Sequence, residues 1–251
     1  MEFREFSDEE WDIIKNLLPP KSWVGRPRAD DRMVLNGILY VLSTGCRWMD
    51  MPLKYGSYKT AWKRLKKWRD EGVWYRILKV LVSVRSHDRV AVDSSTVEAK
   101  KRGELVGYDG FKHKKGSKIH VVVDEDSMLL SIAIGLGSEH DSRRLIELVE
   151  GLEVRPRELY ADSAYDKEHI RRSLESMEIE ANIPVNPRNG RRQRPYNVEL
   201  YKKMKSAVER FFGWLKSFRR IVLRYEKLAS TYKALVTIAS IIIYLRYGIW
   251  R

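Results

Sequence analysis

Residues 118–137, KIHVVVDEDSMLLSIAIGLG, predict a β-hairpin in the middle of the chain. Two apolar runs rich in β-branched residues flank the polar turn Asp124–Glu125–Asp126–Ser127. Short runs of this composition, separated by a polar turn, are typical of two paired strands. The chain therefore contains a sheet, and the segments on either side of the hairpin indicate what kind of sheet it is.

The segments around the hairpin alternate between strand and helix patterns. One strand, DRVAVDSST, precedes the hairpin at residues 88–96. The segments that follow are a helix at 139–152, a strand at 157–162, a helix at 167–179, a strand at 180–185 and a helix at 206–227. Three early strands, followed by strands that crossover helices separate, predict an α/β fold.

The helix at 206–227 has an apolar stripe and one acid at its border. The apolar residues recur at three- and four-residue steps, which is the spacing of one helix face. They are Val208, Phe211, Phe212, Leu215, Phe218 and Val222. Most side chains off the stripe are basic, and Glu209 is the only acid in this helix before Glu226.

The first 86 residues predict helices. Ser7 and Glu10 have the spacing of a capping box at the start of the first helix. A second helix ends near Gly45, and a third lies between Gly56 and Gly72. The apolar residues that face inward from the third helix are Ala61, Leu65 and Trp68. We expect an all-helical domain at residues 1–86, followed by an α/β domain at 87–251 that includes the C-terminal helices.

The charge of the chain indicates a polyanionic partner. The 251 residues carry a formal net charge of +14, and the pI is about 9.7. Residues 21–69 hold twelve Lys and Arg against three acids, and residues 186–224 hold twelve against two. Residues 121–185 hold fifteen acids against seven bases. Two basic segments around an acidic middle favour nucleic acid over an acidic membrane as the partner.

The sequence gives no reason to expect a secreted or membrane-bound protein. Cys46 is the only cysteine, so an intrachain disulfide is excluded. The acidic, amphipathic N-terminus is unlike a secretory signal. The apolar run at 234–245 is shorter than the about 20 residues that a membrane-spanning helix needs, and we expect a buried helix there. We expect a cytoplasmic, nucleoid-associated protein.

Basic side chains in several segments are candidates for DNA contact. The third helix follows a helix and a turn, which is the layout of a helix-turn-helix reader; the alternative is a solvated helix that happens to be basic. A basic loop follows the first strand, and a second precedes the last long helix. The candidates from these three segments are Lys59, Lys63, Arg64, Lys67, Lys114, Lys115, Arg191 and Arg192.

Two acids stand where an apolar strand pattern ends, in VAVD (Asp93) and LYAD (Asp162). If the two strands are neighbours, the carboxylates lie close together and repel unless a cation lies between them. Oxygen ligands favour Mg²⁺ or Mn²⁺. Glu209, on a helix packed across the same edge of the sheet, is the candidate third ligand. Two such ions between carboxylates and phosphate support phosphodiester chemistry.

Each acid also has a structural explanation. Asp93 would stabilise the loop Ser94–Ser95–Thr96, Asp162 would cap the next helix, and Glu209 would pair with Lys205 one turn earlier. Asp124 also follows an apolar run, but its place in the hairpin turn explains it. The three acids in a strand, strand and helix context are more specific than any one of them.

Several blocks resemble DDE-type insertion-sequence transposases of one compact bacterial and archaeal group. They are VDSST, KIHVVVD, LYADSAYD and AVERFFGWLKSFRRIVLRYEK. The N-terminal residues FSDEEWDIIKNLLPP and GRPRADDRMVLNGILYVLSTGCRWMDMP resemble the helical domain usually fused to that catalytic domain. The resemblance implies a ribonuclease-H-like core with a triad of Asp93, Asp162 and Glu209 that holds two Mg²⁺ or Mn²⁺ ions.

The last acid of this group belongs to a Tyr-x2-Arg-x3-Glu-x6-Lys signature. Glu209 and Lys216 fit it, whereas Lys205 stands at the Arg position and Tyr201 lies one residue too early. Lys keeps the charge of Arg but loses its bidentate fork. The resemblance implies that Lys205 and Lys216 contact DNA phosphate.

The leading hypothesis is therefore a metal-dependent DNA transposase. It would hydrolyse DNA at the terminal inverted repeats of an insertion sequence and join the freed 3′-hydroxyl to target DNA. It would act as a homo-oligomer, because two ends must be brought together. The alternatives are a non-catalytic DNA-binding repressor or transposase remnant, and a nuclease of the same fold.

Overall fold

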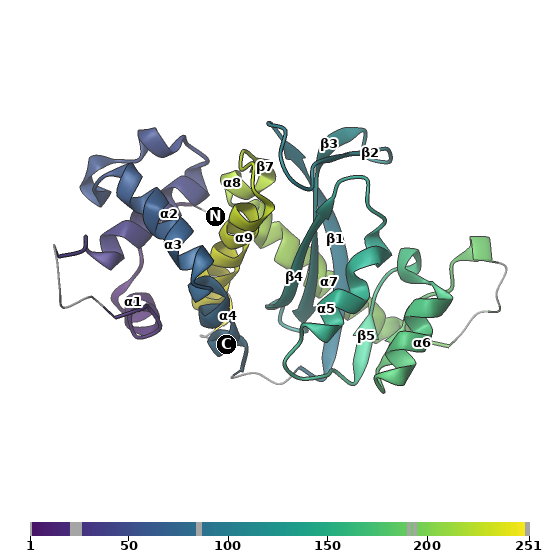
Figure 1. The fold of residues 1–251 in the computed structure, drawn as a ribbon. Helices are drawn as coiled ribbons and strands as arrows, with labels where there is room; N and C mark the ends of the chain where they lie inside the picture. Colours follow the sequence, from purple (N-terminus) through teal and green to yellow (C-terminus); the bar gives the residue numbers. More distant parts are fainter. Residues whose placement is uncertain (1, 21–26, 84–86, 190–191, 193–194, 249–251) are drawn as a thin grey trace. The chain divides into compact units, whose positions relative to one another are not determined.

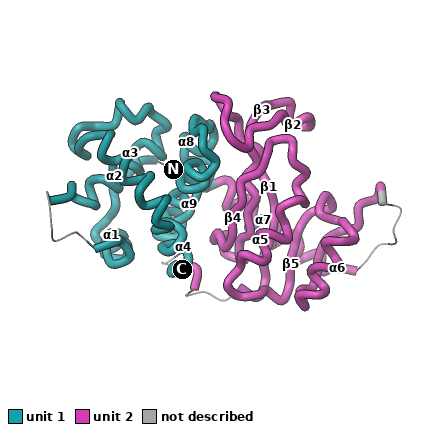
Figure 2. The backbone as a smooth tube through the Cα atoms, in the orientation of Figure 1, with its two compact units in different colours: residues 1–81, 214–251 teal, residues 82–213 magenta. Residues whose placement is uncertain are grey.

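The computed structural model describes residues 2–20, 27–83, 87–189, 192 and 195–248. The chain divides into two compact units (Figure 2): residues 1–81 with 214–251, and residues 82–213. The expected domain boundary near residue 86 falls close to the first division. The C-terminal segment differs from the expectation, because residues 214–251 group with the N-terminal helices and not with the sheet.

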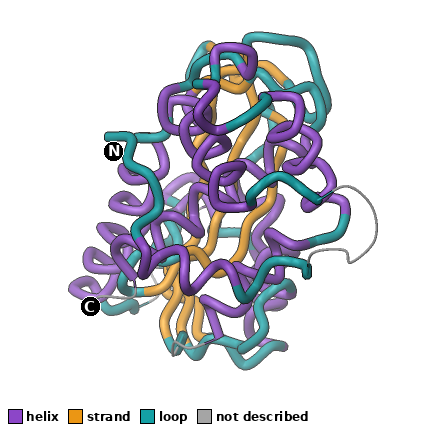
Figure 3. The backbone as a smooth tube through the Cα atoms, turned by 90° about the vertical axis from the view of Figure 1, so that its left-hand side faces the viewer, coloured by secondary structure: helices purple, strands orange, loops and turns teal. Residues whose placement is uncertain are grey.

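The unit of residues 82–213 is built on a mixed sheet (Figures 1 and 3). Its strands are β1 (Arg89–Ala99), β2 (Gly107–Asp109), β3 (Lys114–Asp124), β4 (Leu129–Leu136), β5 (Glu158–Tyr160) and β6 (Glu180–Asn182). Strands β1, β3 and β4 are antiparallel neighbours, whereas β5 pairs in parallel with both β1 and β6. The predicted hairpin and the later parallel strands are thus present. Strand β2 lies in a segment that the sequence analysis treated as a loop.

The hairpin forms as its sequence predicts. Asp124 ends β3, and its carboxylate accepts hydrogen bonds from the backbone N–H groups of Asp126 and Met128, at 2.9 and 2.8 Å. Ser127 takes a positive φ of 71° in the turn. This Asp therefore has the structural role that the sequence analysis gave it.

Strand β1 is longer than predicted. The sequence analysis placed Asp93 at the end of an apolar strand, but β1 continues to Ala99 and pairs with β3 as far as Glu98 opposite Gly116. The apolar run stops at Asp93, whereas the strand is held by its backbone pairing and by the buried side chains of Thr96 and Val97. Asp93 therefore lies inside a paired strand, which fixes its backbone.

Helices flank the sheet. Within residues 82–213 they are η3 (Asp141–Arg144), α5 (Leu145–Glu150), η4 (Ser163–Tyr165), α6 (Glu168–Ser176), η5 (Pro187–Asn189) and the greater part of α7 (Val198–Lys216). Helix α5 packs on β3 and β4, and α6 contacts β6.

The single helix predicted at 206–227 is wrong at both ends. Helix α7 begins at Val198 and ends at Lys216, and the chain continues as α8 (Arg219–Val222) and β7 (Leu223–Arg224). Helix α7 ends where Ser217 donates its hydroxyl to the Trp214 carbonyl at 2.6 Å, because such a bond competes with a further helical turn. The stripe is buried from Val208 to Phe218, whereas Val222 is 43% exposed.

The other unit is helical. Its N-terminal elements are α1 (Asp8–Lys15), α2 (Asp31–Thr44), η1 (Trp48–Asp50), η2 (Leu53–Tyr55), α3 (Tyr58–Asp70) and α4 (Val73–Ser83), and its C-terminal ones include α9 (Ala229–Ile243) and η6 (Tyr244–Gly248). The capping box of Ser7 and Glu10 is confirmed, and Gly45 ends α2 with a φ of 72°. Residues 45–57, with two 3₁₀ turns, connect α2 to α3, which is longer than the short turn of a helix-turn-helix motif.

Helix α9 contains the most apolar stretch of the chain. The side chains of Leu235, Val236 and Ala239 are fully buried there, as the sequence analysis expected. None of the helices in the described ranges has the length and apolar character that crossing a membrane requires.

Gly116 provides a test of the β1–β3 register. A Cβ at this position would lie 1.8 Å from the carbonyl oxygen of Val97, so the backbone of a central strand would have to move. We expect Gly116→Ala to lower the free energy of unfolding by about 2 kcal/mol or more, measured by chemical denaturation. Gly110→Ala, where a Cβ meets nothing within 4 Å, is the matched control. Equal stability of the two variants would contradict the register.

Candidate active site

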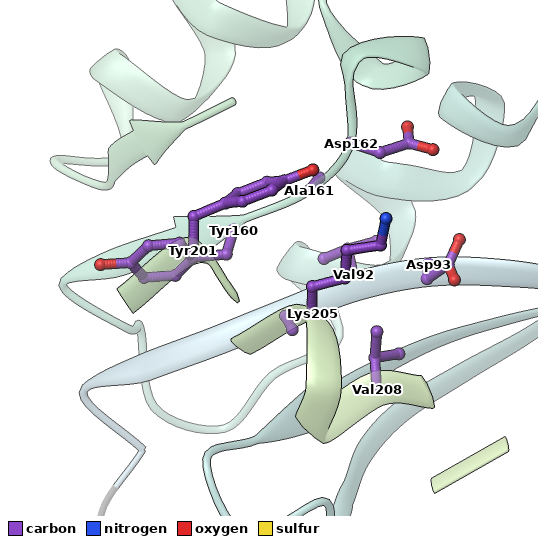
Figure 4. A pocket seen from close by; sticks show the side chains of 9 residues that line it. Val92, Asp93, Tyr160, Ala161, Asp162, Tyr201, Lys205 and Val208 are labelled. Carbon is purple, nitrogen blue, oxygen red and sulfur yellow. The ribbon is translucent and has the colours of Figure 1, made fainter. Parts of the chain in front are cut away.

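The parallel pairing of β1 with β5 brings two carboxylates together. Ala91 pairs with Tyr160, so continuing the register by two residues sets Asp93 beside Asp162. Neighbouring strands lie about 4.8 Å apart, and residues two apart point to the same face. Both acids line one small pocket of about 40 Å³ (Figure 4), which has room for a few water-sized ligands.

Backbone N–H groups orient both acids. Asp93 accepts a hydrogen bond from the backbone N–H of Ser94 at 2.7 Å. Asp162 caps η4 and accepts from the N–H of Ala164 at 2.8 Å. Asp162 thus caps the 3₁₀ turn η4 and not the following helix, for which the sequence analysis considered it; the N-cap of that helix, α6, is Lys167.

A third acid, Asp141, contributes to the same electrostatic environment. Its carboxylate accepts hydrogen bonds from the Ser94 hydroxyl at 2.6 Å and from the Lys118 ammonium at 2.7 Å. Lys118 also donates to the backbone carbonyl of Glu139 at 2.6 Å. Asp141 is not among the site residues predicted from the sequence, and it does not cap η3, whose N-cap is His140. The position of the Asp141 carboxylate depends on contacts with β1 and β3, and no local sequence pattern predicts these contacts.

The pKa values reflect three carboxylates in a partly buried site. The pKa of Asp93 is raised to about 6, mainly by burial; the charges of Asp162 and Asp141 add to this rise, and the hydrogen bond from the Ser94 N–H opposes it. Burial, followed by the charge of Asp141, also raises the pKa of Asp162. Burial acts the same way on Asp141, but hydrogen bonds from Lys118 and Ser94 outweigh it and lower the pKa of that group. The site therefore favours a bound positive charge.

Helix α7 covers the pocket with one face. Tyr201, Lys205 and Val208 line it, and the Lys205 ammonium points toward the space between the two carboxylates (Figure 4). The charge of Lys205 lowers the pKa of Asp162. The two residues that depart from the family signature, Tyr201 and Lys205, are thus the ones that α7 presents to the acids.

Glu209 lies one turn beyond Lys205 on α7 and does not line the pocket. Its carboxylate is 4.0 Å from the Lys205 ammonium, and its side chain is 61% exposed. The pairing with Lys205 considered from the sequence is therefore present. Glu209 is close enough to Tyr201 for its charge to raise the pKa of that phenol, an effect smaller than those of burial and of Asp162.

The donor set suits a hard divalent cation. Mg²⁺ is usually bound through one or two carboxylates, with water and substrate phosphate completing the shell. Asp93 and Asp162 provide such a pair. Among the residues that the structure describes, no group of three or more His, Cys, Asp or Glu side chains is arranged to hold an ion.

Most of the basic candidates are exposed. The exposed side chains are Lys59, Lys63, Lys67, Lys115, Arg192, Lys205 and Lys216, and Lys114 is half-buried. Arg64 differs from the expectation: its guanidinium pairs with buried Asp31 and lies 5.1 Å from the Trp68 ring centroid. The side chain of Arg64 is only 11% exposed, which gives it a role in packing α3. Arg191 lies outside the described residues.

Two family models match the chain. Residues 6–78 match a model described as a putative transposase of the IS4/5 family, and residues 85–245 match the transposase DDE domain. An uncharacterised 16.2 kDa protein of insertion element IS402 from Burkholderia cepacia is 41% identical over 113 residues, 40% of this chain and 77% of that protein. A putative transposase for insertion sequence IS6501 from Brucella ovis is 36% identical over 132 residues, 52% of this chain and 98% of that protein.

A solved structure shares the fold. The piggyBac transposase, in a synaptic complex with hairpin DNA, superposes with a TM-score of 0.54 at 12% identity, over 95% of this chain and 71% of that one. This likeness concerns the fold alone. Together with the mixed sheet and the N-terminal helices, it confirms the expected α/β, ribonuclease-H-like fold class.

The raised pKa of Asp93 predicts a pH-dependent effect of Asp93→Asn on stability. Above pH 6 the folded wild type holds an ionised, half-buried carboxylate, so its stability falls as the pH rises from about 4 to 6. Without metal, we expect Asp93→Asn to be more stable than wild type at pH 8, by on the order of 1–2 kcal/mol, and equally stable at pH 4.

Thermal unfolding with a chelator present measures this difference. Asp88→Asn, at an exposed acid just before β1, is the control and should change stability little at either pH. A variant Asp93→Asn that is less stable than wild type at pH 8 would contradict the electrostatic account.

Proposed function

The chain belongs to the DDE transposase family, and from that membership we propose that it cuts DNA at the ends of an insertion sequence and joins the freed 3′-hydroxyls to target DNA. The reaction would take place at the carboxylates of Asp93, Asp162 and Glu209. As a DNA transposase the protein has DNA as its partner. We further propose that the terminal inverted repeats are the sites of cutting.

One observation carries this proposal: Asp93 and Asp162 share a pocket in which burial, together with the charge of nearby carboxylates, raises the pKa of each. Such an arrangement is unfavourable in a protein that needs only a folded core, so it indicates a site that binds positive charge. Transposases of this family generally use divalent metal ions. We propose two Mg²⁺ or Mn²⁺ ions, held by Asp93 and Asp162 with Glu209 as the third ligand.

The bound ions would activate the attacking water or 3′-hydroxyl and stabilise the leaving oxygen. The chain's own groups position the DNA. Lys205 lies beside the carboxylates, where its ammonium can neutralise a backbone phosphate. Tyr201, which lines the same pocket, can donate its hydroxyl to a phosphate oxygen. Lys216 lies two turns beyond Glu209 on α7 and is exposed for a further phosphate contact.

Asp141 positions this machinery in our proposal. It holds the Ser94 hydroxyl, next to Asp93 in the chain, and anchors the Lys118 ammonium. These contacts fix the strand segment that carries Asp93. A carboxylate that orients a metal ligand through a neighbouring group affects activity without touching the substrate.

The proposed activity is tested by incubating the protein with labelled DNA that carries the element's own ends, a second duplex and Mg²⁺. A transposase releases 3′-hydroxyl ends and joins them to the second duplex. A DNA-binding repressor would shift the labelled DNA without cutting it, and a nuclease would cut without joining. Because two ends must meet, we expect the active species to be a homo-oligomer on DNA.

In the same assay we expect Asp93→Asn to abolish cutting while DNA binding stays close to that of wild type. The amide keeps the acceptor for the Ser94 N–H but loses the charge that would hold the ions. Asp88→Asn serves as the control and should cut normally. Cutting by Asp93→Asn at the wild-type rate would refute the site assignment.

The role proposed for Asp141 predicts a smaller effect. Asp141→Asn keeps an acceptor for the Ser94 hydroxyl but removes the charge that pairs with Lys118. We expect cutting to fall by about 10- to 100-fold, with DNA affinity changed little. The concentration of Mg²⁺ needed for half-maximal cutting should rise as well, since an indirect effect on the ligands weakens metal binding. Unchanged cutting and unchanged Mg²⁺ dependence would exclude the role.

A further inference from the structure

A second cavity lies entirely within the unit of residues 1–81 and 214–251. Its volume is about 320 Å³, in the range of small-molecule binding sites. The side chains that carry the argument are Trp48, Trp62, Lys66, Arg220, Tyr225 and Lys227. They come from η1, from α3, from α8 and from the segment that joins β7 to α9.

The lining of this cavity combines aromatic rings with cations. The rings of Trp48 and Trp62 lie 5.1 Å apart at an angle of 58°. The Lys66 ammonium lies 5.6 Å from the centre of the Trp62 ring, and the Arg220 guanidinium lies 4.8 Å from that of Tyr225. The Trp48 indole N–H is buried and has no acceptor among the described residues. A flat ligand with acceptor atoms would complement such walls.

The net charge of the residues that line the cavity favours an anionic ligand over a cationic one. Lys66, Arg220 and Lys227 against the single acid Glu226 leave a net charge of +2. Aromatic cages also bind quaternary ammonium groups, but a positive lining repels a cation. A ligand that combines an aromatic face with a negative charge suits both properties of the cavity.

The wall that carries Arg220 is held in place before any ligand binds. The Arg220 guanidinium donates to the Glu226 carboxylate at 2.9 Å and to the Cys46 carbonyl at 3.1 Å. Nearby, buried Arg224 donates to the Glu226 carbonyl at 3.0 Å. Preorganised side chains reduce the entropy that a ligand must remove on binding.

We propose that this cavity binds one unpaired nucleobase of a DNA strand, with Lys66 and Lys227 on the adjoining phosphates. This inference rests on the proposed function, because it takes DNA as the ligand. A base inside a duplex has both faces covered by its neighbours, so only an unpaired or extruded base can stack in a concave site. Stacking on aromatic side chains depends little on which base is stacked, so we expect the cavity to accept any of the four bases.

The test compares two short single strands of equal length and charge, one of thymidines and one with abasic sites throughout. Both are titrated without metal, and binding is followed by anisotropy and by quenching of tryptophan fluorescence. The wild type should bind the thymidine strand about 5- to 100-fold more tightly than the abasic strand. This comparison needs no variant, so it cannot fail through misfolding.

Variants then locate the effect. Trp62→Ala should remove most of the preference for the thymidine strand, and Trp62→Phe, which keeps an aromatic face, should retain it. Lys63→Ala is the control, since Lys63 is exposed on the same helix and does not line the cavity. It should change both affinities by the same factor.

Equal affinity of the wild type for the two strands, or an unchanged preference in Trp62→Ala, would overturn the inference. The outcome is separable from the proposed function. Cutting and joining of end DNA without a thymidine preference would reject this cavity alone, whereas a Trp62-dependent preference without any cutting would leave the cavity as a base-binding site and reject the chemistry.

Discussion

The parallel pairing of β1 with β5 is the constraint on which the rest of the site depends. It sets the chain positions of Asp93 and Asp162 side by side, although 68 residues separate them in the sequence. Holding two ionised carboxylates in one partly buried pocket is unfavourable in the absence of a cation, and the raised pKa of Asp93 reflects this. The antiparallel strands on the other side of β1 hold its backbone against this repulsion. A pocket that holds carboxylates together at this cost gains from binding cations.

Positive charge is distributed in a way that matches this arrangement. The chain is strongly basic, yet its acids gather in the middle of the sequence, where the sheet and its pocket are formed. Lys205 enters the pocket from α7 and Lys118 holds Asp141 from β3. A Lys at the signature position of Arg still delivers a charge to the acids, although without a bidentate fork. Its ammonium is a compact point charge with three donors, so it neutralises a carboxylate or phosphate without the fixed two-bond geometry of a guanidinium.

Local patterns in the sequence predicted the features that local physics determines. The hairpin turn at Asp124, the capping box of Ser7 and the buried face of α3 all depend on neighbours within a few residues. The features that were missed depend on distant partners. Asp141 needs Ser94 and Lys118, and Arg64 is held by Asp31. The sequence also could not indicate that residues 214–251 pack with the N-terminal helices. An apolar helix pattern predicts that the helix is buried, but not which other element buries it.

The most direct test of the central claim is a crystal structure of the protein with end DNA and Mn²⁺, in which anomalous scattering locates the Mn²⁺ ions. We predict two peaks that the carboxylates of Asp93, Asp162 and Glu209 would hold, with the Lys205 ammonium on a DNA phosphate. Mn²⁺ bound elsewhere on the protein, with Lys205 still between the two carboxylates, would contradict the account.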